Sequence, residues 1–182
     1  MKESEEREFR DFAAARLESL RRVAYLLCHD WHAADDLVQT VLLKLYQRWR
    51  RLAHVDNLDA YVRGMLANAW LDELRRPWRR ERATERLPEH AAAADGADPD
   101  RHLGRLLLRL GPRQRAVVVL RFYCDQSVEQ TAHLLGISEG TVKSQAARAL
   151  DTLRALMTGA APDRTAGGAS RPQRLLATEV TR

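Results

Sequence analysis

The spacing of apolar residues limits this chain to helices more strongly than any other feature. Apolar side chains recur every three or four residues in three successive series, over residues 9–27, 37–49 and 58–74. That interval places them on one face of an amphipathic helix, whereas a half-buried strand would need strict alternation. We therefore predict an all-α fold that begins with three helices around one small core.

Polar and helix-breaking residues predict where these helices begin and end. We expect the first helix to end near Asp30 and the third to stop before Pro77, because the residue before a proline avoids the helical conformation. Asp35 and Asp36 are expected in the first turn of the second helix, where a carboxylate suits the positive helix end.

Beyond these helices the chain divides into two helical parts. Residues 82–101 contain an alanine run with Pro88 and Pro99 and show no apolar period, which is typical of a linker. A second series begins at Leu103, and the stretch after Met157 has the glycine and proline content of a disordered tail. The expected organisation is a domain over residues 1–80, a flexible linker over 81–101, a second domain over 102–157 and a tail over 158–182.

The charge balance permits a polyanionic partner. The 182 residues carry a net charge of +5, which is compatible with nucleic acid but does not establish it, because many basic proteins bind none. The N-terminus is charged, and no segment reaches the roughly 18 to 20 apolar residues that cross a bilayer. We therefore expect a soluble, cytoplasmic protein without a membrane partner.

Residues that carry enzymatic or metal chemistry are sparse. Cys28 and Cys124 form no CxxC pair, which favours reduced thiols over a disulfide framework. Cys28, His29 and His32 cluster at a helix end but lack a fourth nearby ligand for zinc. The sequence also shows no nucleophile–base pair and no phosphate loop. We expect no metal, no cofactor and no catalytic residue, and hence a protein that is not itself an enzyme.

Residues 127–157 follow the pattern of a helix-turn-helix. A short apolar series ends at Leu135, Gly136 supplies a left-handed turn residue, Ile137 fills the core and Ser138 is placed to cap the next helix. The alternative is an ordinary helical hairpin with a solvated face. Because glycine, apolar residue and cap stand in the order that the motif requires, we interpret the segment as a reader of double-stranded DNA.

The second helix of this motif has a polar outer face. Its buried stripe is expected to consist of Val142, Ala146, Ala149, Leu150, Leu153 and Leu156. The opposite face carries short polar and cationic side chains that could bond phosphates and base edges in the major groove. The expected duplex-contacting residues are Thr141, Lys143, Ser144, Gln145 and Arg148.

Three strings occur in order along the chain. They read DLVQ at residues 36–39, NLDAYVRGMLANAWLDELRR at 57–76 and GTVKS at 140–144. These strings resemble the core-polymerase-binding helix, the promoter-melting helix and the second domain of the extracytoplasmic-function (ECF) group of bacterial sigma factors. The continuation PWRRE at 77–81 is similar to the actinobacterial SigE-like branch of that group. The resemblance extends over about residues 6–156.

The resemblance implies that the first domain binds core RNA polymerase through the second helix. Asp36 and Gln39 match polar contact positions, and Leu37 and Val38 support them. The alternative for these residues is helix capping and core packing. Thr40 departs from the glutamate that is usual at its position in the family, which puts that one contact in doubt.

The third helix is expected to bind the melted minus-ten strand. Tyr61, Asn68, Asp72 and Arg75 are spaced by seven, four and three residues, so they share one side of a helix where they could face unstacked bases. By resemblance Asn68 contacts a flipped base, whereas Tyr61 is open to a core role. The full set of expected minus-ten residues is Tyr61, Arg63, Asn68, Asp72, Arg75, Arg76 and Arg79.

Basic residues continue past the third helix. Arg75, Arg76, Arg79, Arg80, Arg82 and Arg86 outnumber the acidic residues among them and suit phosphate contacts, with a solvated charge run as the alternative. Gln145 stands where the wider family often has arginine. It removes a phosphate or guanine contact and adds an amide that can pair with adenine.

The function that these features predict is that of a sigma factor. It would bind core RNA polymerase, direct it to promoters through the minus-thirty-five element and help to melt the minus-ten element. The expected partners are core polymerase and promoter DNA, duplex and melted, and an anti-sigma factor is left open. Two rivals remain: a dimeric helix-turn-helix regulator that never touches polymerase, and a sigma-like decoy that binds proteins without opening promoters.

Overall fold

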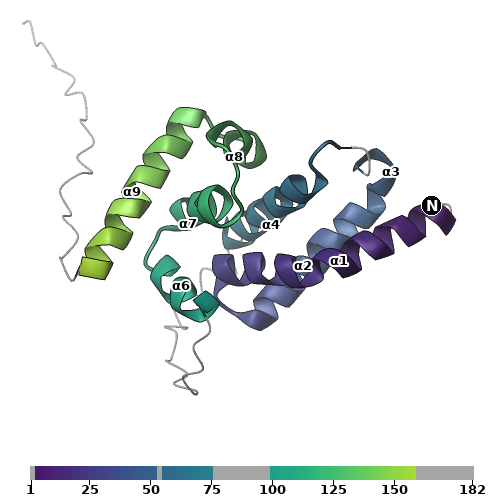
Figure 1. The fold of residues 1–182 in the computed structure, drawn as a ribbon, viewed down its shortest axis with the longest axis horizontal. Helices are drawn as coiled ribbons and strands as arrows, with labels where there is room; N and C mark the ends of the chain where they lie inside the picture. Colours follow the sequence, from purple (N-terminus) through teal and green to yellow (C-terminus); the bar gives the residue numbers. More distant parts are fainter. Residues whose placement is uncertain (1–2, 53–54, 76–98, 159–182) are drawn as a thin grey trace, which may run out of the picture.

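The computed structural model describes residues 3–52, 55–75 and 99–158, and all regular structure in these ranges is helical (Figure 1). The all-α prediction is confirmed. The helices are α1 Glu3–Cys28, α2 Trp31–Gln47, α3 Trp49–Leu52, α4 Leu58–Arg75, α6 Pro99–Leu107, α7 Pro112–Val118, the π-helix η1 Val119–Tyr123, α8 Val128–Leu135 and α9 Glu139–Thr158.

The first three long helices pack together as expected. α1 lies along α2 and also contacts α4, and Arg16 on α1 bonds Asp59 on α4 at 2.8 Å. α1 ends at Cys28, close to the expected Asp30, because His29 adopts a left-handed conformation with φ of 58°. His29 then donates its backbone N–H to the carbonyl of Tyr25 at 2.6 Å, which closes the helix end.

The expected start of α2 was wrong. The helix begins at Trp31, and Asp30 is its N-cap, accepting the backbone N–H groups of His32 at 2.8 Å and Ala33 at 3.1 Å. Asp35 and Asp36 therefore lie beyond the first turn. The expected start came too late because it was placed from the apolar series that begins at Leu37. Trp31 and Ala34 extend the buried stripe of the helix towards the N-terminus.

α2 also ends earlier than expected, and Trp49 belongs to the short helix α3. Its indole is buried and lies edge-on to the ring of Phe9 with centroids 5.3 Å apart. Phe12 approaches the same indole at 5.6 Å. This aromatic group joins the beginning of α1 to the end of the α2–α3 segment.

The second half of the chain begins with α6 at Pro99, so the last three residues of the expected linker are helical. The remainder of the expected linker and the tail after Thr158 lie outside the described residues. Gly111 caps α7, and Pro112 occupies its first position, where the missing N–H is not needed. Phe122 is apolar but 52% exposed, because the π-helical turn of η1 shifts the register of the last residues.

The two halves share buried surface. Ala116, Val119, Leu120 and Cys124 from α7, η1 and the residue that follows join one core cluster with side chains of α1, α2 and α4. Arg115 lies at the centre of this junction and is only 8% exposed. Its guanidinium donates to the carbonyl of Leu27 at 2.7 Å and to that of Leu107 at 2.9 Å. None of the helices in the described ranges is long and apolar enough to cross a membrane.

Candidate nucleic-acid interface

The helix-turn-helix prediction is confirmed in its local geometry. Ser127 caps α8: its hydroxyl accepts the Gln130 N–H at 3.0 Å, and the Gln130 side chain accepts the Ser127 N–H at 2.7 Å. Gly136 ends α8 in the left-handed region with φ of 62°, where a side chain would be strained. Ile137 follows and packs against the buried cluster of Val117, Ala132 and Val142.

Ser138 caps α9 as expected. Its hydroxyl accepts the backbone N–H of Thr141 at 3.2 Å and lies 2.9 Å from the Thr141 hydroxyl. Val142 and Ala149 are fully buried. The remaining members of the expected stripe, Ala146, Leu150, Leu153 and Leu156, are half-buried, so the helix turns the intended face inwards.

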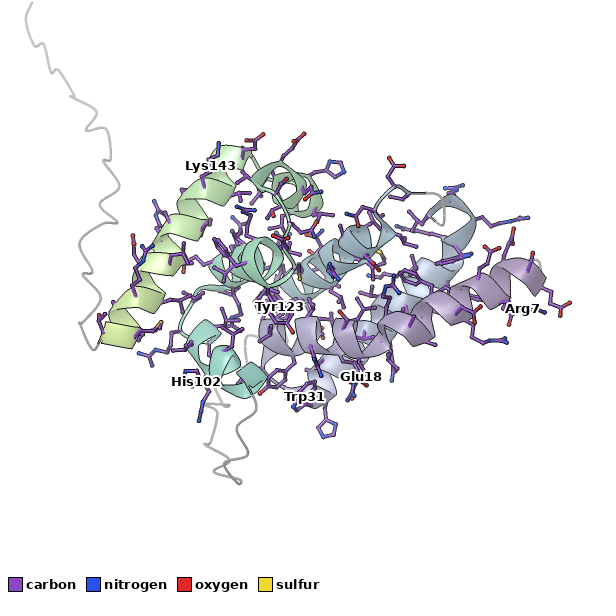
Figure 2. The ribbon with its side chains drawn as sticks, in the orientation of Figure 1. Arg7, Glu18, Trp31, His102, Tyr123 and Lys143 are labelled. Atoms are coloured by element: carbon purple, nitrogen blue, oxygen red, sulfur yellow. The ribbon has the colours of Figure 1, made fainter. Side chains whose placement is uncertain are left out.

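The outer face of α9 presents most of the expected duplex contacts to solvent. Lys143, Ser144 and Arg148 are exposed, and Lys143 is labelled near the start of α9 in Figure 2. Its ammonium pairs with Glu139 at 3.5 Å. Thr141 is half-buried. A cationic and hydroxyl-bearing helix face of this kind can meet both phosphates and base edges.

Gln145 is less accessible than the other expected duplex contacts. It is half-buried and lines an open cavity of about 490 Å³ between α9, the beginning of α7 and the end of α4. Arg75, an expected minus-ten contact, lines the same cavity, together with Leu71 and Leu74. Two residues expected to touch different promoter elements therefore face one hollow in this arrangement.

The expected single-strand surface lies on α4. Asn57 caps this helix by accepting the N–H of Ala60 at 2.9 Å. Tyr61 and Asn68 are half-buried, whereas Asp72 and Arg75 are exposed and pair at 3.4 Å. The Asn68 amide donates to the backbone carbonyl of Leu134 at 2.7 Å, so α8 occupies part of this surface.

Two further basic contacts differ in their surroundings. Arg63 is half-buried near Cys124, where burial raises the pKa of the Cys124 thiol to about 11 and the guanidinium opposes that rise. Arg76 and Arg79 lie outside the described residues.

The expected polymerase-binding residues divide into two groups. Asp36 and Gln39 are exposed on α2, as a contact role requires. Leu37 and Val38 are only 4% and 2% exposed, which favours their alternative role in core packing and leaves them to support Asp36 and Gln39 from beneath. Sequence reasoning missed Leu43, which is 59% exposed. Its position four residues after Gln39 places it on the same face.

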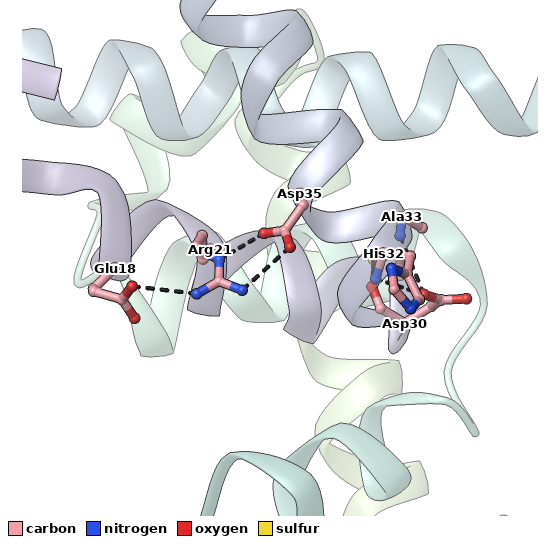
Figure 3. Close-up of polar contacts among 7 residues, drawn as sticks. Glu18, Arg21, Asp30, His32, Ala33 and Asp35 are labelled. Carbon is pink, nitrogen blue, oxygen red and sulfur yellow. Dashed lines mark hydrogen bonds and ion pairs between the residues drawn. The ribbon is translucent and has the colours of Figure 1, made fainter. Parts of the chain in front are cut away.

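Asp36 does not cap α2, which was the alternative to its contact role. Asp30 provides the cap, and Asp35 accepts from Arg21 of α1 at 2.5 and 3.2 Å (Figure 3). The hydrogen bonds and charge of Arg21 hold the pKa of the Asp35 carboxyl below its usual range. Of the three carboxylates, Asp36 remains available on the surface.

The helix end with two histidines does not assemble a metal site. Within residues 3–52, 55–75 and 99–158, no three His, Cys, Asp or Glu side chains are grouped to hold an ion. The thiol of Cys28 instead donates to the carbonyls of Ala24 at 3.1 Å and Asp30 at 3.2 Å. Burial raises the pKa of Cys28 to about 11, so the thiol stays protonated at neutral pH.

Comparison with known proteins agrees with this geometry. Residues 12–80 match the Sigma-70 region 2 family and residues 106–155 match Sigma-70, region 4. The RNA polymerase sigma-E factor of Streptomyces avermitilis is 40% identical over 152 residues, which cover 81% of this chain and 83% of that protein. The ECF RNA polymerase sigma factor SigM of Mycobacterium tuberculosis is 32% identical, with 76% and 71% covered.

Solved structures show the same fold. The sigma factor RpoE in complex with the anti-sigma factor NepR from Bartonella quintana superposes with a TM-score of 0.65 at 25% identity, covering 83% of this chain and 97% of that chain. CnrH in complex with the cytosolic domain of CnrY gives a TM-score of 0.60, covering 86% and 91%. With both sigma regions present in order and a capped helix-turn-helix in the second, the chain belongs to the ECF group of RNA polymerase sigma factors, close to the SigE-like proteins of Streptomyces.

Proposed function

We propose that this sigma factor contacts promoters at two places and core polymerase at a third. The observation that carries the proposal is the separation of three surfaces on different helices: Asp36 and Gln39 on α2, Asn68 on α4 and Arg148 on α9. Such a division lets one protein bind polymerase while it reads two DNA elements. The proposed organisation keeps residues 1–80 and 102–157 as the two recognition domains, with 81–101 as the linker and 158–182 as the tail.

Core polymerase binding is assigned to the exposed stripe of α2. Asp36, Gln39 and Leu43 follow one another at spacings of three and four residues, and all three are exposed. An apolar side chain beside polar ones suits a protein partner, since it can be buried in a contact whose rim is polar.

Minus-ten recognition is assigned to α4. Its amide, aromatic and guanidinium groups on one side suit unstacked bases and the backbone of a single strand. The assigned residues are Tyr61, Arg63, Asn68, Asp72 and Arg75, together with Arg76 and Arg79, which follow in the sequence.

Minus-thirty-five recognition is assigned to α9 entering the major groove. Lys143 and Arg148 would bond phosphates, and Thr141, Ser144 and Gln145 would meet base edges. Gln145 would favour adenine where an arginine favours guanine. A promoter reader of this kind works beside the chromosome, in the cytoplasm.

An anti-sigma factor is a further proposed partner. The support is the likeness to RpoE, whose structure was solved in complex with the anti-sigma factor NepR. The catalysis that this chain enables belongs to polymerase, and we propose no reaction for the chain itself.

The proposal is tested with reconstituted holoenzyme. Asn68→Ala should reduce permanganate reactivity of the melted promoter while retaining duplex binding. Arg148→Ala should instead weaken the binding of duplex promoter DNA itself. Equal losses in both steps for both variants would contradict the division between α4 and α9.

Core binding needs a separate measurement. Co-purification with core polymerase and promoter-specific run-off transcription should both succeed for the wild-type chain and should fall for Asp36→Ala. Failure of both assays with wild-type protein would favour a conventional helix-turn-helix regulator. Polymerase binding without promoter opening would favour a decoy.

A further inference from the structure

The duplex-reading helix carries a carboxylate at the end that would enter the major groove. Glu139 is the first residue of α9, and its side chain is 54% exposed. In Figure 1 this end of α9 follows α8 at the edge of the molecule. The first residues of a recognition helix are those that contact base edges. A carboxylate at this place repels phosphates, so its presence on a DNA-binding face requires an explanation.

Helix stability explains only part of this placement. An acidic side chain in a first turn interacts favourably with the positive helix end. The capping hydrogen bond of α9, however, comes from Ser138, whose hydroxyl accepts the Thr141 N–H at 3.2 Å. Glu139 is therefore not the cap, and its carboxylate is open to a partner outside the chain.

Lys143 balances the charge of Glu139 on the same side of the helix. Its ammonium lies 3.5 Å from the carboxylate, one turn further along α9. An ammonium has three hydrogen-bond donors, so one can point at Glu139 while another reaches a phosphate. Both side chains are exposed, and such a pair adds little to the stability of a fold. Its consequence is that a carboxylate can lie against DNA without a net negative charge.

The residue beside Glu139 leaves room for DNA. Gly140 lies in the first turn of α9, and a Cβ atom there would meet, within 4 Å and among the described residues, only the Ser138 hydroxyl oxygen at 3.9 Å. Neither packing nor backbone conformation therefore requires glycine, although alanine would favour the helix more. Ser144 and Ala147 continue the same face and are also small and exposed. The start of α9 can thus approach a base-pair edge closely.

The chemistry of a carboxylate discriminates among the four bases. An ionised carboxylate only accepts hydrogen bonds. In the major groove guanine and thymine present acceptors, adenine presents a donor beside an acceptor, and cytosine presents its N4 amine as a donor. Cytosine is therefore the base whose edge complements Glu139, whereas guanine or thymine would set acceptor against acceptor.

We propose that Glu139 is a specificity-determining residue, which selects cytosine in the minus-thirty-five element by accepting a hydrogen bond from its N4 amine. The inference rests on the proposed entry of α9 into the major groove. Lys143 balances the carboxylate while it bonds a phosphate, and Gly140 lets the helix come close. Replacing the selected cytosine should lower the affinity of wild-type holoenzyme about tenfold, the usual order for one mismatched base pair.

The test uses reconstituted holoenzyme and a pool of duplex DNA with a long randomised segment, whose bound members are sequenced. The wild-type sequences should share a cytosine position that Glu139→Gln converts to adenine, because an amide pairs with the N6 and N7 groups of adenine. Asp151→Asn is the matched control. It also replaces an exposed, ion-paired carboxylate of α9 by its amide, three turns further along, and should leave the selected sequence unchanged.

The outcomes separate this inference from the function on which it rests. Identical selected sequences for Glu139→Gln and wild type, or wild-type sequences without a shared cytosine, would overturn the inference. If Arg148→Ala still weakens duplex binding in that case, α9 remains the duplex reader. If Arg148→Ala has no effect either, the proposed role of α9 is wrong as well.

Close approach is measured with Gly140→Ala, by anisotropy of a fluorescent duplex that carries the selected sequence. The added methyl group should weaken holoenzyme binding several-fold, although it favours the helix. Gly111→Ala is its control and should not change binding, since a Cβ there meets, in the part of the chain that the structure describes, only the Gln114 side chain at 3.7 Å. Equal affinities of Gly140→Ala and wild type would overturn the close approach and with it the cytosine contact.

Discussion

At the scale of single residues, three carboxylates within seven positions have different roles. Asp30 caps a helix, Asp35 joins α2 to Arg21 of α1, and Asp36 faces solvent. Their chemistry is identical, so the backbone geometry around each one decides its role. Asp30 alone has an extended backbone, with φ of −142° and ψ of 122°, which lets its side chain turn back to the first amides of the helix.

The Arg21–Asp35 pair predicts a pH dependence of stability. The pKa of Asp35 is lowered in the folded chain, so the stability that the pair contributes is present above the unfolded pKa of about 4 and is lost as pH falls through the lower folded pKa. Arg21→Gln should therefore lower the urea midpoint at pH 7, and the difference from wild type should shrink towards pH 3.

The control for this pair is Glu18→Gln. It removes only the contact of Arg21 with the exposed Glu18 at 3.2 Å and should change the midpoint less than Arg21→Gln does. An effect of Arg21→Gln that stays constant from pH 7 to pH 3 would contradict the role given to Asp35.

At the scale of elements, the ends of the helices depend on caps that lie outside the apolar periods. Asn57, Ser127 and Ser138 each cap a helix, and each stands directly before a periodic apolar series, a place where the sequence favours a cap. Asp30 was not, because Trp31 and Ala34 begin the buried stripe of α2 before the series that starts at Leu37. The error shifted the expected start of this helix and made Asp36 look like a capping residue, a role that Asp30 fills.

The corrected start of α2 predicts unequal effects of two similar substitutions. Asp30→Ala leaves two amide groups of the first turn without their acceptor and should lower the free energy of unfolding by about 1 kcal/mol. Asp36→Ala should leave stability within about 0.5 kcal/mol, as expected for an exposed side chain away from a cap. Urea unfolding followed by circular dichroism measures both, and a larger loss for Asp36→Ala would show that the cap is misassigned.

At the scale of the whole molecule, the two sigma regions behave as one packed unit. Their buried side chains form a common cluster, and Arg115 sits within it with all three of its guanidinium nitrogens donating to carbonyls. Burial lowers the pKa of Arg115 to about 10, which still leaves the guanidinium charged at neutral pH. The carbonyls around it compensate for much of the hydration that it loses.

This arrangement predicts coupled unfolding of the two halves. The wild-type chain should show one calorimetric transition, and Arg115→Lys should destabilise it by about 2 to 3 kcal/mol, because an ammonium cannot reach the carbonyls of α1 and α6 together. Arg113→Lys is the control at an exposed neighbour and should have little effect. Two separate transitions in the wild-type chain would contradict the shared core.

The sequence by itself determined the helices, the helix-turn-helix and the sigma family, because periodicity, caps and turn glycines act over a few residues and can be read locally. Only the tertiary structure decided that Leu37 and Val38 are core, that Leu43 is exposed, and that Asn68 and Gln145 face the opposite half of the molecule. Asn68 and Leu134 are 66 positions apart in the chain. Contacts over such separations depend on how whole helices pack, and no local pattern in either segment encodes the partner that it will meet.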